Sequence, residues 1–422
     1  MPIERLDARE VSRFLAKKLA SAGYYSLATA LKRISRTKTF KSIKKTANGV
    51  ACFEGGSGDV AALVWGVGDP NEPSGAASVV RLATMLERNL RRVLGEITWY
   101  LVPVLDPEGL SLNYWVEMAY TPENYAIWSY RRPLTAAREY CFTLKEGAKF
   151  EEAKLLEDIM REIRPDLVIS LHNQPFPGSY CIEVGKHIML DAFPAIVRVL
   201  NSSVWDVDLL FDEYIRASAG VYTVDLLRIL PSESMCGVFY AVAKGYAKYG
   251  AIFDMALYED SKASSRKPTK MELASLVKES ERACEKLNGT AKLILRSIGR
   301  FIDKRHPVYE YYADAWTSEG CEEPRELARR SAFESELAYY HLYKVLWRRL
   351  YFWGQTIRLL KEAALDTSIV RSWRRLAEAK FEVSYRELRK RSRIKPVPKW
   401  KQITLQVAST LFAAVSLAQQ EF

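Results

Sequence analysis

Two carboxylates, Asp69 and Glu72, lie three residues apart in the stretch GVGDPNEPSG, between an apolar run and a helix-like run. An acidic side chain just before a helix or in its first turn can cap the N-terminus and suits the helix dipole. The same two carboxylates can instead bind a divalent metal ion. On this loop alone helix capping is the simpler interpretation, and a metal site needs further donors nearby.

Further candidate donors follow two later strand-like runs. The run VPVL leads into a D-P-E-G turn that starts at Asp106, with Asn113 a few residues on, and DLVISLH ends at His172 before a loop containing Pro and Gly. The chain has only four histidines, so a metal site must use one or two of them or rely on carboxylates. In α/β sheets ligands bind outside the carboxyl ends of the strands, and we expect these loops to meet there.

The elements that would position these loops alternate between helix and strand patterns. Helical spacing of apolar residues marks 10–34, 75–94 and 150–163, and short apolar runs typical of strands lie between and after them. Such alternation predicts an α/β sheet with helices packed on its faces. After about residue 263 the strand pattern stops and long helical patterns follow, which predicts an all-helical C-terminal segment.

The distribution of charge supports this division. Residues 1–260 contain 30 Lys and Arg against 32 Asp and Glu, whereas the rest of the chain contains 32 against 19. We therefore predict an N-terminal helical lead-in over 1–45, an α/β domain with the candidate site over 46–262, and a basic helical domain over 263–422.

Cysteine spacing and the N-terminal stretch bear on the cellular compartment. The six cysteines form no C-x-x-C pair, and the stretch MPIERLDARE is too charged for a signal peptide. Both features favour a reducing cytoplasm with free, buried thiols. We expect a cytoplasmic protein without a disulfide framework or a cysteine zinc knuckle.

Taken together and in this order, the D-P-N-E stretch, the D-P-E-G turn and the strand-end His172 resemble motifs of the zinc metallocarboxypeptidases, the carboxypeptidase A-like hydrolases. The resemblance covers roughly residues 49–260. In that family an H-x-x-E motif and a later His bind one zinc ion, which implies Asp69, Glu72 and His172 as metal ligands here. The resemblance also implies a mixed sheet with helices on both faces.

The first implied ligand departs from the family pattern, because Asp69 stands where the family has His. An Asp Oδ and a His Nδ1 are both two bonds beyond Cβ, so the reach is nearly preserved, and Asp can bind zinc. The charge is not preserved, since two carboxylates neutralise a dication and make it less able to lower the pKa of a bound water. Oxygen-rich ligation also favours harder ions such as Mn²⁺ or Mg²⁺. We expect one zinc ion, with another divalent metal as the alternative.

The resemblance also implies a carboxylate that acts as general base late in the domain. Asp254, in the run GAIFDMA, occupies that place, and Glu259 and Asp260 are rival candidates. A general base must lie within about 2.6–3.2 Å of the water that it deprotonates. The structural alternative for Asp254 is a cap at the end of a strand.

An Asn-Arg pair holds the terminal carboxylate of the substrate in this family. Asn113 matches the Asn, but Tyr114 follows it, and the nearest other cations are Arg131 and Arg132. A guanidinium can pair with a carboxylate through two hydrogen bonds, as such a pocket needs. The alternative is an exposed arginine pair in an aromatic loop.

These residues together predict a metal-dependent hydrolase that cleaves an amide or peptide bond next to a terminal carboxylate of a peptide or acyl-amino-acid substrate. One alternative is a catalytically inactive binding protein on the same fold, marked by its altered ligand. Another is a nucleic-acid-associated protein that binds through the basic run Arg386–Lys401, although such a run is more often a solvated helix face. The uncharged run 402–420 is typical of a buried closing helix rather than a membrane anchor.

Overall fold

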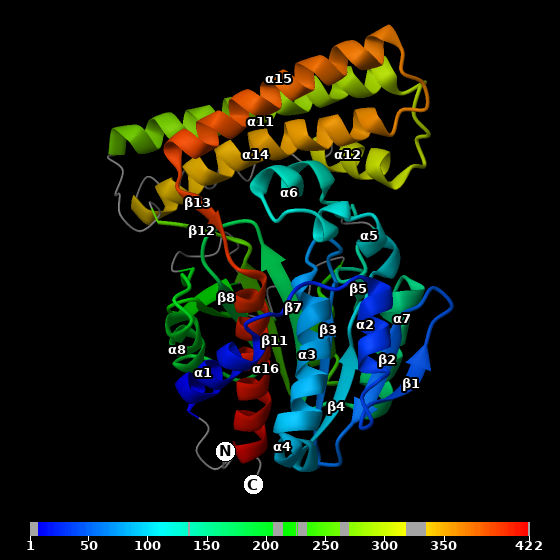
Figure 1. Ribbon diagram of the computed structural model, residues 1–422, viewed down its shortest axis with the longest axis vertical. Helices are drawn as coiled ribbons and strands as arrows, with labels where there is room; N and C mark the ends of the chain where they lie inside the picture. The colour runs from blue at the N-terminus through cyan, green and yellow to red at the C-terminus, as the bar shows by residue number, and fades with distance from the viewer. Residues whose placement is uncertain are drawn as a thin grey trace. The chain divides into compact units, whose positions relative to one another are not determined.

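The computed structural model divides into two compact units (Figure 1). Unit 1 consists of Met1–Leu112, Leu134–Leu257 and Val397–Phe422, and unit 2 consists of Asn113–Pro133 and Tyr258–Pro396. The residues that the structure describes are 7–133, 136–205, 214–224, 226, 234–261, 270–317 and 335–420.

Unit 1 is built on one nine-stranded sheet with the strand order β1-β2-β4-β3-β7-β11-β8-β10-β9. The central strands β4, β3, β7 and β11 are parallel to one another, whereas β2 and β8 pair antiparallel to their inner neighbours. The predicted mixed sheet is therefore confirmed. The strands are β1 (Lys41–Lys45), β2 (Ala51–Gly55), β3 (Val60–Gly66), β4 (Ile97–Val102), β7 (Leu167–Gln174), β8 (Tyr180–Val184), β9 (Tyr214–Ser218), β10 (Val221–Val224) and β11 (Tyr249–Ala256).

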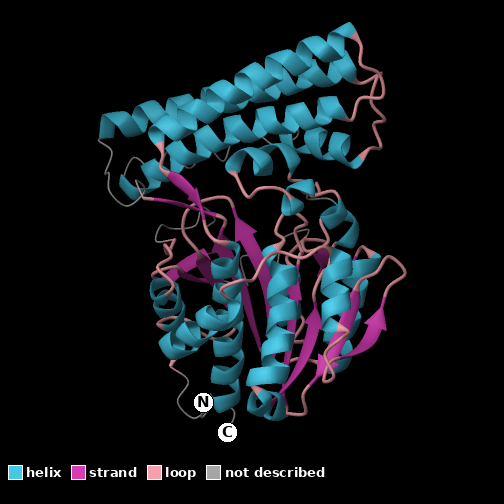
Figure 2. Cartoon of the chain, in the orientation of Figure 1, coloured by secondary structure: helices cyan, strands magenta, loops and turns pink. Residues whose placement is uncertain are grey.

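Helices cover both faces of this sheet (Figures 1 and 2). The central strands are buried along almost their whole length, as apolar strands between two helical layers should be. One layer holds α1 (Ala8–Leu19), α3 (Ser74–Asn89), α8 (Ala192–Val199) and α16 (Lys399–Gln420), and the other holds α7 (Glu151–Ile163) and α10 (Gly237–Ala243). Shorter elements of unit 1 are α2 (Leu27–Ile34), α4 (Arg91–Glu96), α5 (Pro107–Ser111), β5 (Phe142–Thr143) and β6 (Gly147–Ala148).

The C-terminal helix α16 belongs to unit 1, where it packs on α1, α3 and α8 and on strands β7 and β11. Most of its side chains are buried, in agreement with the closing helix expected over 402–420. Among the described residues, no helix combines the length and the apolar character that crossing a membrane requires. The two units divide the chain differently from the predicted segments 1–45, 46–262 and 263–422, since α1, α2 and α16 all belong to unit 1.

Unit 2 is mainly helical, as predicted for the C-terminal part. Helix α14 packs on α6, α11, α12 and α15, and a two-stranded sheet joins β12 to β13. Segment 113–133 belongs to this unit because the Gln355 amide donates to the carbonyls of Ala126 and Ser129 at 2.8 and 3.0 Å. The elements are η2 (Tyr114–Glu117), α6 (Pro122–Trp128), β12 (Tyr258–Asp260), α11 (Lys270–Ile298), α12 (Pro307–Thr317), α14 (Ser335–Lys361), α15 (Ser368–Arg391) and β13 (Ile394–Pro396).

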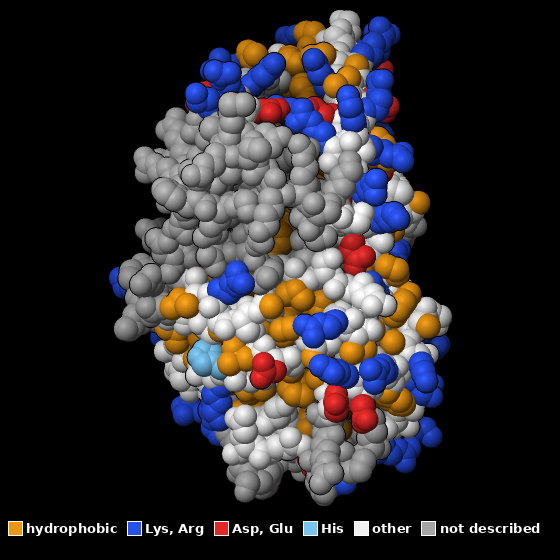
Figure 3. Space-filling model, turned by 90° about the vertical axis from the view of Figure 1, so that its left-hand side faces the viewer, with side chains coloured by type: hydrophobic (Ala, Val, Ile, Leu, Met, Phe, Trp, Pro, Cys, Tyr) orange, Lys and Arg blue, Asp and Glu red, His pale blue; other side chains and the backbone are white. Residues whose placement is uncertain are grey.

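The basic run Arg386–Lys401 does not form one surface element. It comprises the end of α15, strand β13 and the start of α16. Lys401 is buried and donates to the carbonyl of Asn201, and the Lys399 ammonium lies 4.7 Å from the centre of the Tyr24 ring. On the face drawn in Figure 3, Lys and Arg side chains are spread among acidic and apolar ones.

The thiols follow the expectation only in part. Four described cysteines are free and buried, namely Cys52, Cys141, Cys181 and Cys236. Cys284 is disulfide-bonded, so the expectation of free thiols throughout is wrong at this position. Cys321 lies outside the described residues.

Two glycines bring the end of β3 and the start of α3 into backbone contact. A Cβ built on Gly66 would lie 2.4 Å from the carbonyl carbon of Gly75, and a Cβ on Gly75 would lie 2.9 Å from the Gly66 Cα and 3.0 Å from the Leu171 oxygen. A side chain at either position would therefore push the strand and the helix apart. This close approach fixes the path of the loop that carries Asp69 and Glu72.

We expect Gly75→Ala to lower the free energy of unfolding by about 1–3 kcal/mol, because the added methyl group overpacks this contact. Chemical denaturation followed by circular dichroism measures the change. The matched control is Gly95→Ala in α4, where nothing lies within 4 Å of an added Cβ. That control should be neutral or stabilise by up to about 1 kcal/mol, because glycine is a poor helix former. Equal stability of Gly75→Ala and the wild type would contradict the proposed packing.

Candidate metal site

Asp69, Glu72 and His172 lie together in unit 1. One ligand atom from each can be chosen so that all three atoms lie within 4.8 Å of one another. The carboxylates come from the loop after β3, and the imidazole comes from the neighbouring parallel strand β7. All three side chains are buried, with 2%, 7% and 3% of their surface exposed. The carboxyl ends of these two strands therefore meet as the sequence predicts.

The capping interpretation does not describe this loop. Helix α3 begins at Ser74, its N-cap residue is Pro73, and no side chain makes a capping hydrogen bond there. Glu72 instead points its Oε2 at His172, 2.8 Å from Nδ1, and the same oxygen accepts a hydrogen bond from the Asn173 backbone N–H at 3.0 Å. The two acids thus face the histidine rather than the end of the helix.

The electrostatics of the cluster show how strongly these groups interact. Burial raises the pKa of Glu72 to about 7, although the charge of His172 opposes the shift, and Asp69 and Asp254 raise it further. Burial lowers the pKa of His172, but the carboxylates of Glu72 and Glu139 outweigh it and hold that pKa well above its usual value. Several buried carboxylates therefore surround a single imidazole.

The donor set fits a divalent cation. Two carboxylates and one imidazole are ligands that Zn²⁺ accepts, and carboxylates also suit Mn²⁺ and Mg²⁺. Buried charges in proteins are normally paired or coordinate metals, and an ion at Asp69, Glu72 and His172 would neutralise the carboxylates. The imidazole presents Nδ1 to this cluster, because its Nε2 lies 2.8 Å from the Ser170 hydroxyl on the other side of the ring.

Asp254 lies next to this cluster on β11. It is the register partner of His172 on one side and of Tyr180 on the other, and 8% of its surface is exposed. Burial raises the pKa of the Tyr180 hydroxyl well above its usual value, and the Asp254 carboxylate raises it further. The rival candidates Glu259 and Asp260 lie in β12 of unit 2, where an Asp260 oxygen accepts the Arg393 backbone N–H at 2.9 Å.

The D-P-E-G turn supports the loop that carries the two acids. Asp106 caps α5 by accepting the Gly109 N–H at 2.8 Å. A Cβ on Gly109 would lie 2.7 Å from the Cβ of Pro70, so the turn and the D-P-N-E loop pack directly on each other. The fold therefore brings these two motifs together, and the Asp106 side chain caps α5.

The candidate substrate-binding residues all lie in unit 2. The Asn113 amide accepts the Tyr130 N–H at 2.7 Å and donates to the Tyr130 carbonyl at 3.0 Å, so it fixes the backbone directly before Arg131. Arg131 and Arg132 are partly exposed. A role for these three residues in binding substrate stays a prediction.

Glu139 is a site residue that the sequence did not indicate. Its side chain is fully buried, and Oε1 lies 3.7 Å from the His172 Nε2. Burial raises the pKa of Glu139, but the hydrogen bonds and charge of His172, with smaller contributions from Cys236 and Trp65, outweigh it and lower that pKa overall. No spacing pattern links Glu139 to the other motifs, because it approaches His172 only through the fold.

Helix α16 makes hydrogen bonds to the end of β7, the strand that carries His172. The Gln406 amide donates to the His172 carbonyl at 2.8 Å, and its oxygen accepts hydrogen bonds from Ser74 and Ser78 at 3.0 and 2.6 Å. The Asn173 amide donates to the Gln402 oxygen at 3.3 Å and to the Met255 carbonyl at 3.1 Å. These bonds join the end of β7 and the start of α3 to the C-terminal helix.

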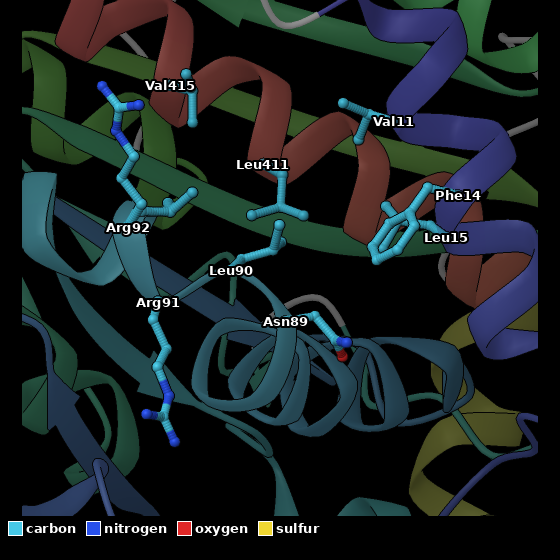
Figure 4. Close-up of a pocket in the computed structure, with 10 residues that line it drawn as sticks. Val11, Phe14, Leu15, Asn89, Leu90, Arg91, Arg92, Leu411 and Val415 are labelled. Carbon is cyan, nitrogen blue, oxygen red and sulfur yellow. The ribbon is translucent and has the colours of Figure 1, made fainter. Parts of the chain in front are cut away.

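A separate cavity of about 270 Å³ lies among α1, α4 and α16 (Figure 4). Phe14, Leu411 and Val415 contribute to its largely apolar wall, with Arg91 and Arg92 among the polar residues around it. None of the predicted site residues lines this cavity, so the candidate chemistry rests on the cluster of Asp69, Glu72 and His172.

No family model matches the chain, and no curated protein matches it either. Several solved structures are similar to the chain. A protein from Shewanella baltica described as a metallopeptidase is similar at 14% identity and a TM-score of 0.40, over 55% of this chain and 82% of that one. A metallo-carboxypeptidase from Burkholderia cenocepacia is similar at 13% identity and a TM-score of 0.36, over 54% of this chain and 59% of that one.

A metallo-carboxypeptidase from Pseudomonas aeruginosa, solved in complex with (2-guanidinoethylmercapto)succinic acid, is similar at 12% identity and a TM-score of 0.35, over 54% of this chain and 58% of that one. These three structures are described as metallopeptidases or metallo-carboxypeptidases, the class of protein whose motifs the sequence resembles. At such identities and TM-scores no activity is transferred from them, and the function proposed for this chain rests on its own side chains.

We expect Gln406→Met to lower the free energy of unfolding by about 2–4 kcal/mol, because it leaves the His172 carbonyl and the Ser78 hydroxyl without this partner, at about 1–3 kcal/mol for each unsatisfied group, whereas the Ser74 hydroxyl keeps its hydrogen bond to Asn173. Urea denaturation measures the loss. Gln420→Met, at the exposed end of the same helix, is the control and should stay within about 0.5 kcal/mol of the wild type. If both variants were equally stable, the hydrogen bonds of Gln406 would not hold the ligand strand.

Proposed function

We propose that this chain is a metal-dependent hydrolase of the carboxypeptidase type, which cleaves an amide or peptide bond next to a terminal carboxylate. The observation that carries the proposal is the buried Asp69, Glu72 and His172 cluster, whose ligand atoms lie within 4.8 Å of one another. Its position at the carboxyl ends of β3 and β7 is where α/β sheets bind their ligands.

The chain's own residues would hold the ion and move the proton. Asp69, Glu72 and His172 would hold one divalent cation, zinc in the first instance, which would polarise a carbonyl as a Lewis acid and lower the pKa of a water. Asp254 accepts the proton from the attacking water and passes it to the leaving amine. It suits this role because it neighbours His172 on the adjacent strand and keeps a small exposed fraction.

Asn113, Arg131 and Arg132 are proposed as the substrate-binding residues. Arg131 or Arg132 would pair with the terminal carboxylate of a peptide or acyl-amino acid, since a guanidinium can bind it through two hydrogen bonds. Asn113 would act through its hold on the Tyr130 backbone, which sets the start of the arginine pair.

A non-catalytic binding protein is the second candidate function, and Asp69 is the residue that favours it. Two carboxylates neutralise a dication, so a water near it is acidified less than in a site with two histidines. The substitution Asp69→His distinguishes the two candidates. Hydrolysis that appears only in this variant would favour a binding protein, whereas hydrolysis by the wild type favours the enzyme.

Nucleic-acid binding through Arg386–Lys401 has less support. Lys399 and Lys401 lie against Tyr24 and Asn201 within unit 1, so these two cations are used inside the protein. Salt-dependent binding of DNA or RNA that is lost on neutralising Arg386, Arg389 and Lys390 would restore this candidate.

We expect the wild type to bind about one Zn²⁺ or Mn²⁺ per chain and Asp69→Ala to bind neither with comparable affinity. Dialysis against each metal followed by elemental analysis measures the content. Asp191→Ala, an exposed acid outside the cluster, is the control and should bind like the wild type. A wild type that binds no metal under any loading condition would overturn the proposed function.

We expect Asp254→Asn to retain the metal and to lose about 10²–10⁴-fold in the rate of hydrolysis, the usual contribution of a general base. The probe is a set of N-acetylated dipeptides with different C-terminal residues, and release of the free amino acid gives the rate. Asp260→Asn and Glu259→Gln are the matched variants at the rival positions and should keep activity within about twofold. The opposite pattern would place the base in β12.

A further inference from the structure

The imidazole of His172 has partners on both sides of its ring. Nδ1 faces Glu72 at 2.8 Å, within the metal cluster. Nε2 faces away from that cluster, toward the Ser170 hydroxyl at 2.8 Å and the Glu139 carboxylate at 3.7 Å. All four side chains are buried. The proposed function uses only the side of the ring that faces Glu72.

Glu139 is held firmly behind the ring. Its Oε2 accepts a hydrogen bond from the indole N–H of Trp65 at 2.7 Å, and the Cys236 thiol lies 3.1 Å from Oε1. A Cβ on Gly68 would lie 2.0 Å from Oε2, so the backbone before Asp69 packs directly on this carboxylate. Glu139 thus contacts β3, the loop that carries Asp69 and the start of α10.

The environment of Nε2 decides where a neutral imidazole keeps its hydrogen. A hydroxyl that can accept a hydrogen bond and a fixed negative charge both stabilise an N–H at Nε2. With a cation held by Asp69, Glu72 and His172, the lone pair would then lie on Nδ1, the nitrogen that faces these two acids. Ligand histidines commonly have such an outer partner on the other ring nitrogen, and its loss typically costs 10–100-fold in metal affinity.

We propose that Glu139, together with Ser170, is a positioning residue that keeps the His172 hydrogen on Nε2 and its Nδ1 lone pair directed at the metal cluster. This inference rests on the proposed metal site. Glu139 does not touch the ion or the substrate. It acts through His172 and through the backbone at Gly68.

The test is Glu139→Gln, which keeps the size of the side chain and an oxygen for the Trp65 indole but removes the charge. The Kd for Zn²⁺, measured by competition with a chelating dye, should rise about 10–100-fold. In the zinc-loaded protein, ¹⁵N NMR should show His172 bound through Nδ1 with a hydrogen on Nε2 in the wild type. In Glu139→Gln the His172 hydrogen should no longer be confined to Nε2.

Two further variants keep the inference falsifiable if Glu139→Gln folds poorly. Ser170→Ala removes the hydrogen-bond partner of Nε2 with little change in volume, and it should weaken zinc binding by about 10-fold. Glu183→Gln is the matched control, because Glu183 is also fully buried and accepts from the Ile188 and Met189 backbone at 2.8 and 2.9 Å, away from the metal cluster. Its zinc affinity should stay within about twofold of the wild type.

The outcomes separate the inference from the function on which it rests. A wild type that binds no metal overturns both. A wild type that binds zinc, with unchanged affinity and an unchanged NMR state in Glu139→Gln and Ser170→Ala, overturns only the positioning role. An equal loss of affinity in Glu183→Gln would mean that general destabilisation is responsible, and it also overturns the role. Selective loss in the two variants supports it.

Discussion

Charge balance around one buried histidine is the constraint on which the rest of unit 1 depends. Asp69, Glu72, Glu139 and Asp254 all lie around His172, and each is at least nine-tenths buried. Removing a carboxylate from water is costly unless it is paired, hydrogen-bonded or bound to a metal. A single imidazole cannot balance all of these acids, and the pKa of Glu72 is raised to about 7, chiefly by burial and further by the charges of Asp69 and Asp254. A divalent cation held by Asp69, Glu72 and His172 would offset these negative charges.

The surrounding structure holds these groups by backbone contacts rather than by long side chains. Gly66 and Gly75 let β3 and α3 touch, which confines the loop between them. Gly109 lets the next turn pack on Pro70 in the same way, and Gly68 makes room for Glu139. Each contact fixes one segment of the site to another, so backbone packing sets the positions of the candidate ligand atoms.

That Asp69, Glu72 and His172 lie close together could be predicted because strand ends are visible in the sequence. Asp69, Glu72 and His172 each follow or end an apolar run, and parallel strands bring their carboxyl ends to one edge. Glu139 could not be predicted in this way. It belongs to a stretch without a clear period and reaches His172 only because the segment after residue 136 folds back against β3.

The sequence pattern also could not predict the boundaries of the two units, for a different reason. Helical spacing shows that α16 has buried faces, but it does not show which core buries them. The charge of the segment 263–422 suggested a single helical domain, whereas the last helix packs on the sheet. Its unusual composition is explained by that position. Gln402 and Gln406 are uncharged and polar because they bond to buried groups at the end of β7, including the His172 carbonyl. The hydrogen bonding at the end of β7 is therefore complete only when α16 is in place, which makes this helix part of the support of the candidate metal site.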